Sequence, residues 1–278
     1  MTYPDLATYL STLPLTDFRF LSQVDSTNDE AFRWVAAGAP HLSLVVADEQ
    51  TAGRGRLDRH WITPPKSALA FSLILRPAPP APHSATSPDP LSFYLIPEQM
   101  PRLTALAALG ICQALQILWS LQAEIKWPND VLLEGRKVAG ILVETSWLGD
   151  QLSAIIVGVG VNVKPGSVPH QKDLLFPATC IETHLSHRTV DRWELLSRIL
   201  DSMLDWIPRL PFPDFIHAWQ YRLAYLGKEV QVYSEASESL TGHIIGLTQD
   251  GSLRLLLPSG EVATLQFGEV HLRLVDNS

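Results

Sequence analysis

The pattern of apolar and polar positions divides most of this chain into short strands and a few helices. Apolar runs with the length and composition of strands are found in six segments: 18–24, 42–47, 68–75, 125–133, 137–145 and 152–163. Apolar residues spaced three and four apart predict helices over 103–119, 190–210 and 214–225. A further helix is expected to start at Ser26 or Thr27, with that residue as its cap, and to extend through Ala37.

From Gly227 onwards the pattern changes to short, closely spaced strands. Five of them are expected, at 229–233, 240–248, 252–257, 261–266 and 270–274. Clusters of turn residues separate them, and this spacing is typical of a small antiparallel barrel. We therefore predict two domains, residues 1–226 and 227–278.

Two segments carry few signals for a helix or a strand. Residues 77–90 are rich in Pro, Ala and Ser, which predicts a flexible surface insertion. Residues 164–176 contain Pro and Gly and are expected to form a long loop, and long loops within a compact domain are often functional.

Composition and charge narrow the class of protein. The chain has 278 residues, is 46% hydrophobic and 18% charged, and carries a formal net charge of −8, which argues against nucleic-acid binding over its whole surface. Cys112 and Cys180 lack metal-ligand spacing and are expected to be reduced core thiols. No secretion signal is visible and no apolar run reaches the ~18 residues of a membrane span, so we expect a soluble, cytoplasmic protein without membrane or nucleic-acid partners.

Two unusual runs indicate an anion site. In Lys126-Trp127-Pro128-Asn129-Asp130 the proline restricts its own backbone and that of Trp127, so Lys126 is expected to be rigid and suited to holding a carboxylate or phosphate oxygen. In residues 53–61 three arginines are interspersed with two glycines, and the run ends on Trp61. Together the two runs predict a polyanion site with an aromatic platform beside it.

Five runs in order carry a resemblance to a known family: 26–28, 50–61, 126–130, 137–144 and 158–162. The chain resembles the biotin protein ligases, which activate biotin with ATP and attach it to a lysine of a carrier protein. The similarity covers about residues 18 to 165 and continues more weakly to the C-terminus. It implies an α+β fold like that of class II synthetases, with a mixed, mainly antiparallel sheet, helices on one face and a small C-terminal SH3-like barrel.

The resemblance gives the anion site a role. Lys126 is expected to bridge the biotin carboxylate and the α-phosphate and, with Arg56, to be catalytic. The alternative is a surface lysine paired with Asp130. Arg54, Arg56 and Arg59 suit phosphate neutralisation, although a solvated basic loop is the commoner meaning of such a pattern.

The polar residues near the start of the predicted helix suit a cyclic urea, because hydroxyl and amide groups match its acceptor and its two N–H donors. Ser26, Thr27 and Asn28 could equally be a simple helix cap. Gly158 and Gly160 remove side chains from one strand face, which allows close approach of an alkyl tail, although a tight strand crossing in the core is about as probable on the pattern alone.

The resemblance implies two sets of site residues. The biotin set is Ser26, Thr27, Asn28, Gln50, Gly53, Arg54, Gly55, Arg56, Lys126, Val131, Gly158 and Gly160, with Val161 as a further lining residue. The nucleotide set is Arg56, Arg59, Trp61, Lys126, Asn129 and Asn162, with Trp61 expected to pack on the adenine. Metal ligands are unknown, and the histidines show no ligand spacing. The tryptophans at 119, 147, 193, 206 and 219 are expected in the core. Asp58 stands where members often have glycine.

The implied cofactors are ATP and Mg²⁺, with biotin as the substrate, and the implied partner is a biotin carboxyl carrier domain, such as that of acetyl-CoA carboxylase. Monomer and homodimer both stay open. About 17 residues precede the first predicted strand, too few for the DNA-binding domain of the repressor-type members, so we expect the ligase-only class. The alternatives are a lipoate–protein ligase, whose Arg-Arg-x-x-Gly-Gly-Gly run is absent from this sequence, and a non-catalytic, biotin-sensing regulator.

Overall fold

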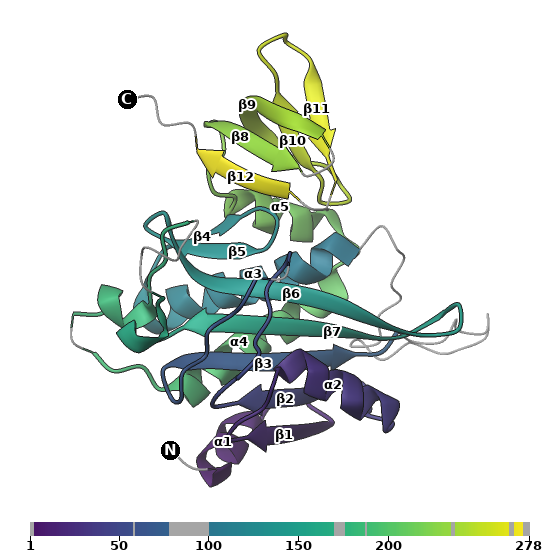
Figure 1. Cartoon of the computed structure of the whole chain (residues 1–278), viewed down its shortest axis with the longest axis vertical. Coiled ribbons are helices and arrows are strands. Elements are labelled where there is room, and N and C mark those ends of the chain that lie inside the picture. The colour runs from purple at the N-terminus through teal and green to yellow at the C-terminus, as the bar shows by residue number, and fades with distance from the viewer. Residues whose placement is uncertain are drawn as a thin grey trace.

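The computed structural model describes residues 3–57, 59–77, 100–169, 176–186, 188–234, 237–266 and 270–274. Its strands form two sheets, seven-stranded in the order β1-β2-β3-β7-β6-β5-β4 and five-stranded in the order β11-β10-β9-β8-β12 (Figure 1). The smaller sheet lies at the end of the molecule opposite the N-terminus. Most of the predicted insertion 77–90 lies outside the described residues.

The bounds of the elements follow the predicted segments closely. The strands of the larger sheet are β1 (Asp17–Leu21), β2 (Ser43–Ala47), β3 (Ala68–Leu75), β4 (Ala123–Lys126), β5 (Asp130–Leu133), β6 (Arg136–Leu148) and β7 (Gln151–Asn162). The helices are α1 (Tyr3–Leu10), α2 (Thr27–Ala36), α3 (Met100–Trp119), α4 (Arg192–Trp206) and α5 (Pro213–Tyr221). The sequence pattern did not predict α1.

The larger sheet is mixed and mainly antiparallel, as predicted. β1 and β2 are parallel, and each of the other neighbouring pairs is antiparallel. Successive residues of a strand face opposite sides, and both sides are buried along β2 and β3. These two strands therefore lack the alternation of polar residues that marks a sheet with one face in water.

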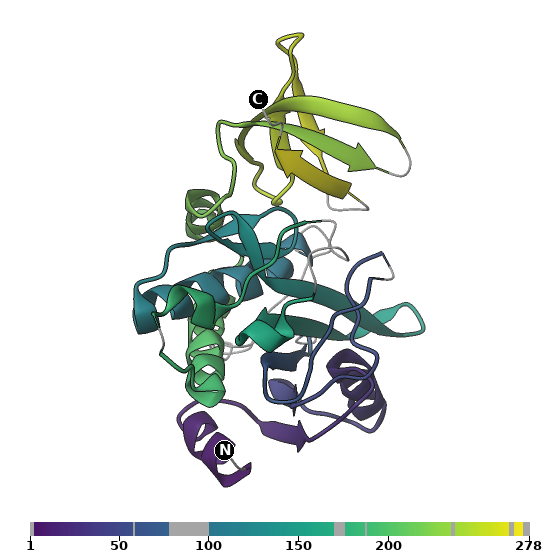
Figure 2. The ribbon, with the colours of Figure 1, turned by 60° about the vertical axis from the view of Figure 1, so that its left-hand side comes forward.

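The expectation that the helices lie on one face is wrong for α2. Leu44 and Val46 pack in the main core with α3 and α4, whereas Val45 packs in a second cluster with Ala31 and Trp34 of α2. Because adjacent residues of β2 point to opposite faces, α2 covers the other side of the sheet (Figure 2). The start of α2 is thereby brought to the face opposite α3.

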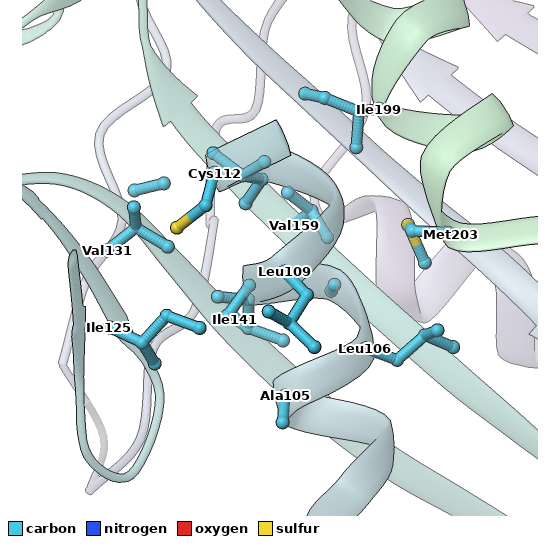
Figure 3. Packing of buried hydrophobic residues seen from close by; sticks show 14 of the residues in the cluster. Ala105, Leu106, Leu109, Cys112, Ile125, Val131, Ile141, Val159, Ile199 and Met203 are labelled. Atoms are coloured by element: carbon cyan, nitrogen blue, oxygen red, sulfur yellow. The ribbon is translucent and has the colours of Figure 1, made fainter. Parts of the chain in front are cut away.

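The helix α3 is the centre of the main core. Figure 3 shows Leu109 and Cys112 of this helix among Val131, Ile141 and Val159 of the sheet. Residues Pro101–Trp119 are long and apolar enough to cross a membrane by length and composition, so the statement that no apolar run reaches this length is wrong. However, 72% of this apolar stretch is buried inside the fold. The packing makes α3 the core helix of this domain.

The run 125–133 forms two strands rather than the single strand predicted. β4 and β5 are antiparallel, with Lys126 paired to Asp130, so residues 127–129 form the turn between them. Pro128 has no N–H to donate to a ladder, which interrupts pairing at this point. The Trp127–Pro128 peptide is cis. The turn places the two ends of the motif side by side.

The five-stranded sheet is formed by β8 (Glu229–Ser234), β9 (Ser237–Leu247), β10 (Leu253–Leu256), β11 (Val262–Leu265) and β12 (Val270–Leu274). These bounds agree closely with the five predicted strands. The turn between β9 and β10 meets the larger domain, where Trp127 Nε1 donates to the Gly251 carbonyl at 3.1 Å. The boundary between residues 226 and 227 stays a prediction.

The tryptophans predicted in the core divide into two groups. Trp193, Trp206 and Trp219 are buried, and Trp119 is half-buried against the core. The prediction is wrong for Trp147, whose side chain is 57% exposed at the end of β6. β6 extends there beyond the helices that cover the sheet, so nothing in the described residues buries that indole.

Candidate functional site

A cavity of about 500 Å³ lies over the face of the larger sheet that carries Gly140 of β6 and Gly158 and Gly160 of β7. Its walls come from the start of α2, residues 50–57 and 59–62, the β4–β5 turn, and residues 167–169 and 176–178, and Leu272 adds a contact from the smaller sheet. Most of the predicted site residues line it: Ser26, Thr27, Asn28, Gln50, Arg54, Gly55, Arg56, Arg59, Trp61, Lys126, Asn129, Gly158, Gly160 and Asn162. Positions far apart in sequence therefore converge on one cavity.

Three predicted lining residues are placed elsewhere. Val131 and Val161 are fully buried in the main core, on the side of the sheet that faces α3, and do not line the cavity. Gly53 lies on the outer side of the loop, where its carbonyl accepts from the Trp61 N–H at 2.8 Å. A side chain at Gly53 would collide with the Trp61 carbonyl, so the course of the loop requires a glycine at this position.

The start of α2 presents hydroxyl groups to one end of the cavity. Ser26 occupies the cap position with an extended backbone, but its side chain makes no capping bond. The Gln50 side-chain oxygen accepts from the Thr27 N–H at 2.8 Å and from its hydroxyl at 3.1 Å, and the Gln50 amide donates to Thr63 at 3.0 Å. Gln50 therefore takes over the capping role, which leaves the Ser26 hydroxyl for a ligand.

Asn28 is held in one orientation by three neighbours. Its side-chain oxygen accepts from Ser72 at 2.6 Å, while its nitrogen donates to Glu144 at 2.6 Å and to the Leu142 carbonyl at 3.3 Å. A side chain at Gly158 would overlap the Asn28 amide. The glycine at 158 thus makes room for Asn28, which is the tight-packing alternative of the sequence analysis.

Arg54 is paired with carboxylates of the protein itself. Its guanidinium lies 2.5 Å from Asp29 on α2 and 3.1 Å from Glu144 on β6. The hydrogen bond with Asp29 is the largest cause of a raised Arg54 pKa, and Glu144 adds to it. With two acidic partners already in place, Arg54 fastens the loop to α2 and β6, and the expectation that it neutralises phosphate is not supported by its contacts.

The other loop arginines turn towards the β4–β5 turn. Arg56 donates to the Asn129 side-chain oxygen at 3.4 Å, and the Asn129 nitrogen donates to the Ile141 carbonyl at 3.0 Å. Arg59 lies near enough to Lys126 to lower its pKa. Both arginines line the cavity together with Lys126, and such a group of cations suits an anionic ligand.

Lys126 is 9% exposed, and its ammonium group lies over the Phe176 ring, 3.8 Å from the centroid. Burial lowers its pKa from the ordinary 10.5 to about 8; Asp130 opposes the shift, and Lys137 and Arg59 add to it. The predicted alternative, an ion pair with Asp130, is not formed. Asp130 is paired instead with Lys137, at 2.6 Å.

Lys137 is a pocket cation that the sequence analysis left without a role. It begins the run 137–144, lines the cavity, and its ammonium group lies 5.4 Å from the centroid of the Trp61 ring. The available signal was the hairpin turn at Glu134-Gly135-Arg136, which brings Lys137 back beside the residues that follow Lys126. Two lysines therefore share this end of the site.

Trp61 lies across the glycines of β6 and β7. Side chains at Gly140 and Gly160 would press against or collide with its ring, and its Nε1 is buried without a hydrogen-bond partner among the described residues. The space opened by Gly160 is thus taken by the indole, not by an open channel. An N–H held in the cavity without a partner is a group that a ligand could satisfy.

Asn162 ends β7 at the cavity wall. It is buried, and its nitrogen donates to the Thr179 carbonyl at 3.1 Å. This bond fixes which way the amide faces, so the side-chain oxygen is the natural acceptor for a ligand. The long loop predicted at 164–176 lies partly outside the described residues, and Ser167 and Phe176 from its described part line the cavity.

The donor set suits a metal ion that arrives with a nucleotide. Within the part of the chain that the structure describes, no three His, Cys, Asp or Glu side chains are grouped to hold a metal. Asp130 offers one carboxylate to the cavity, and Asn129 and Asn162 offer amide oxygens. Mg²⁺ in nucleotide sites commonly takes one or two carboxylates together with substrate phosphates, so these residues fit that mode of binding.

Comparison with known proteins agrees with this site. Residues 20–162 match the biotin/lipoate A/B protein ligase family. The chain is 35% identical to the biotin–[acetyl-CoA-carboxylase] ligase of Paracoccus denitrificans over 254 residues, which is 86% of this chain and 94% of that protein. It is also 35% identical over 177 residues to the bifunctional ligase/repressor BirA of Bacillus spizizenii, and that match covers 64% of this chain and about half, 49%, of the relative.

The fold matches solved structures over nearly its whole length. The biotin protein ligase from Aquifex aeolicus in complex with biotin and ATP has a TM-score of 0.75 and 27% identity, covering 94% of this chain and 100% of that one. The apo structure of the same ligase has a TM-score of 0.70. Sequence, fold and the converged cavity agree, and the chain belongs to the biotin/lipoate A/B protein ligase family.

Proposed function

We propose that this protein activates biotin with ATP to form biotinyl-5′-AMP and then transfers biotin to a lysine of a biotin carrier domain. The observation that carries the proposal is the two-ended cavity. Uncharged hydroxyl and amide groups gather at one end, and Lys126, Lys137, Arg56 and Arg59 gather at the other. A neutral ring and a carboxylate joined by a chain, together with a triphosphate, match such an arrangement.

The uncharged end suits the ureido ring. Ser26 has a hydroxyl that is not used as a cap, Thr27 is held by Gln50, and Asn28 is fixed against Gly158. A ring that offers one carbonyl and two N–H groups in a plane can be met by such donors and acceptors. We assign biotin recognition to these residues, with Gln50 acting through Thr27.

The cationic end suits the first chemical step. A biotin carboxylate oxygen attacks the α-phosphorus of ATP, and the bond to pyrophosphate breaks. Two anions must approach each other, so fixed positive charge at the crowded α-phosphate stabilises the transition state. Lys126 is the residue we assign to the carboxylate and α-phosphate, because it is buried and held, with Lys137 on β6 as a second cation.

The roles of the loop residues divide along their contacts. We assign Arg56 and Arg59 to the phosphate groups of the nucleotide, whereas Arg54 holds the loop through Asp29 and Glu144. We assign Trp61 to stacking on the adenine. This role requires the ring to lie at the cavity wall, and the ring already lies there against Gly160. Closing a loop over the bound ligands would keep water from the mixed anhydride.

Bound with ATP, Mg²⁺ would neutralise phosphate charge, and Asp130, Asn129 and Asn162 are the residues that would hold it. In the second step the amine of the carrier lysine attacks the acyl carbon, AMP departs and a proton is released. The nucleophile belongs to the partner, so the protein has to position and protect the adenylate. We take the partner to be the carrier domain of acetyl-CoA carboxylase, as the name of the Paracoccus relative suggests.

We place the reaction in the cytoplasm, because Cys112 and Cys180 are free thiols, as is usual in a reducing compartment. The division into domains 1–226 and 227–278 is part of the same proposal. It is supported by the five-stranded sheet, which begins at Glu229. Leu272 of that sheet lines the cavity, so the smaller domain contributes directly to the proposed site.

The test is a two-step assay with purified protein. Incubation with ATP, Mg²⁺ and labelled biotin should yield biotinyl-AMP, and addition of a carrier domain should move the label to its single acceptor lysine. A parallel reaction with lipoate distinguishes a biotin ligase from the main alternative, a lipoate–protein ligase. Adenylation of lipoate in preference to biotin would contradict the proposal, and binding of biotin without any adenylate would favour a non-catalytic regulator.

A further inference from the structure

The residues that follow the long loop contact the cavity at three points. The Phe176 ring covers the Lys126 ammonium group at 3.8 Å, and the Thr179 carbonyl accepts from Asn162 at 3.1 Å. Lys137 donates its N–H to the Pro177 carbonyl at 2.8 Å and accepts from the Thr179 N–H at 2.9 Å. Residues 176–179, which we call the bracing segment, thereby touch the proposed lysines and the amide at the end of β7.

The bracing segment pairs with the start of β6, beyond the point where β7 ends. β6 pairs with β7 as far as Ala139 and Val161, and beyond that point Lys137 pairs with Ala178 in a parallel bridge. Two backbone bonds alone hold a segment weakly, because a short isolated pairing is marginal in water. The Asn162 bond and the buried Ile181 also hold this part of the chain, and a side-chain contact of Thr179 adds to them.

The side chains of Thr179 and His184 supply that contact. Thr179 is buried, and its Oγ1 lies 3.0 Å from His184 Nε2, while His184 Nδ1 lies 3.5 Å from the Glu134 carboxylate. A carboxylate can only accept, so a neutral His184 keeps its proton on Nδ1 and accepts the Thr179 hydroxyl proton at Nε2. The imidazole thus links the bracing segment to the turn between β5 and β6.

We propose that Thr179 and His184 are positioning residues for the nucleotide half of the site. Their hydrogen bond holds the bracing segment against the start of β6, which sets the direction of the Asn162 amide and the backbone of Lys137. Neither Thr179 nor His184 lines the cavity. The uncharged end of the cavity, formed by Ser26, Thr27 and Asn28, has no contact with the bracing segment among the interactions described above. The inference rests on the proposed function, because it assigns one end of the cavity to ATP.

The key variants are Thr179→Val, which keeps the shape and removes the hydroxyl, and Thr179→Ser, which restores it. Loss of one buried hydrogen bond is expected to raise the KM for ATP by about three- to tenfold in Thr179→Val. The Kd for biotin should stay near the parent value, and the melting temperature should fall slightly, because one buried hydrogen bond is lost. Thr179→Ser should return the KM for ATP to within about twofold of the parent.

Two further variants make the test specific. Thr183→Val is the matched control, because Thr183 is four residues further along the chain and its hydroxyl contacts Cys180 rather than the bracing segment. His184→Ala removes the other partner. In the double variant Thr179→Val/His184→Ala, the KM for ATP should be no higher than in the more impaired of the two single variants. Coupling of this kind is expected when two residues act through one bond.

The outcomes separate the two levels of the proposal. Equal losses for biotin and ATP, additive effects in the double variant, or a parent-like Thr179→Val would overturn the positioning role while leaving the ligase activity in place. If Thr179→Val fails to fold, His184→Ala with an unchanged KM for ATP would overturn it as well. A parent protein that neither binds ATP in calorimetry nor forms biotinyl-AMP would overturn the proposed function, and the positioning role with it.

Discussion

The indole ring of Trp61 lies so close to Gly160 that a methyl group at that glycine would collide with it. Gly140, opposite Gly160 in the β6–β7 ladder, is also in contact with the ring, so the two glycines form the surface on which the indole rests. The loop 53–61 therefore has a defined seat on the sheet. Its position depends on the absence of side chains at two strand positions.

Gly160→Ala is expected to push Trp61 from this seat. The affinity for ATP should fall more than that for biotin, and overpacking should cost about 1–3 kcal/mol of stability. Titration calorimetry with each ligand and chemical denaturation measure the two effects. Gly166→Ala is the control, since an added methyl would meet only the Ser67 side chain at an ordinary 3.8 Å. Equal ATP affinities in the two variants would contradict the role of the seat.

Lys126 predicts a pH dependence of stability in the ligand-free protein. Its pKa is lowered to about 8 from 10.5, so between these values the unfolded chain binds more protons and stability rises with pH. The contribution is at most about 1.4 kcal/mol per pH unit, and below pH 8 the buried charge destabilises the fold. Lys126→Met should remove this slope in denaturation curves measured from pH 7 to 10. An unchanged slope would show that Lys126 is not the group responsible.

Anion binding should show the opposite trend. A carboxylate or phosphate oxygen is held by the charged form of Lys126, so affinity for the anionic ligands is expected to weaken as pH rises past about 8. Lys126→Ala should reduce adenylate formation by tenfold or more, since a bond to a charged group contributes roughly 1.5–3 kcal/mol. The rate of biotinyl-AMP formation, followed by pyrophosphate release, measures this. A near-parent rate would remove Lys126 from the mechanism and leave Lys137 as the lysine to test next.

Arg54 is expected to matter for the loop rather than for the phosphates. Arg54→Lys keeps the positive charge but cannot span Asp29 and Glu144 with a planar fork. The loop should become more susceptible to limited proteolysis without ligand, while the salt dependence of ATP binding stays as in the parent. Glu144→Gln should have the same effect on cleavage. If Arg54→Lys instead lost ATP affinity in proportion to salt, the arginine would be a phosphate ligand.

Arg56→Gly is expected to release the intermediate. Arg56 reaches from the loop to Asn129 in the β4–β5 turn, and the loss of this link removes one reason for the loop to stay closed over the adenylate. Escaped biotinyl-AMP should label lysines of an added bystander protein, which mass spectrometry detects. Arg56→Lys serves as the charge-preserving comparison. Adenylate formation with labelling confined to the carrier lysine would mean that other residues hold the loop.

The sequence predicted most of the elements because each was marked locally. The five strands from Glu229 to Leu274 are short apolar runs between turn residues, and the helix at 103–119 has a continuous apolar face. Such signals depend on neighbours a few positions away, so they can be read without knowing the fold. The helix α1 was missed because it is only eight residues long, so the buried pair Leu6 and Leu10 gives a single helical repeat.

Pairing across the sheet could not be read in this way. Which lysine meets Asp130 depends on how β5 and β6 align, and the sequence pattern suggested only the nearby Lys126, whereas the sheet brings Lys137 to Asp130. The same holds for Arg54, whose sequence context suggests phosphate binding until Asp29 and Glu144 are brought beside it. Charge compensation is decided by distance in space, because interactions between exposed charges are largely screened beyond about 10 Å.

The sequence by itself determined the family, the alternation of elements and the residue types that gather at the cavity, since these follow from local patterns and from ordered motifs. The tertiary structure decided what each residue faces. It placed Val131 in the core, set Trp61 on Gly160 and joined Thr179 to His184. The physical reason is that a strand residue has two possible faces and a loop residue many, and only packing against distant segments selects one of them.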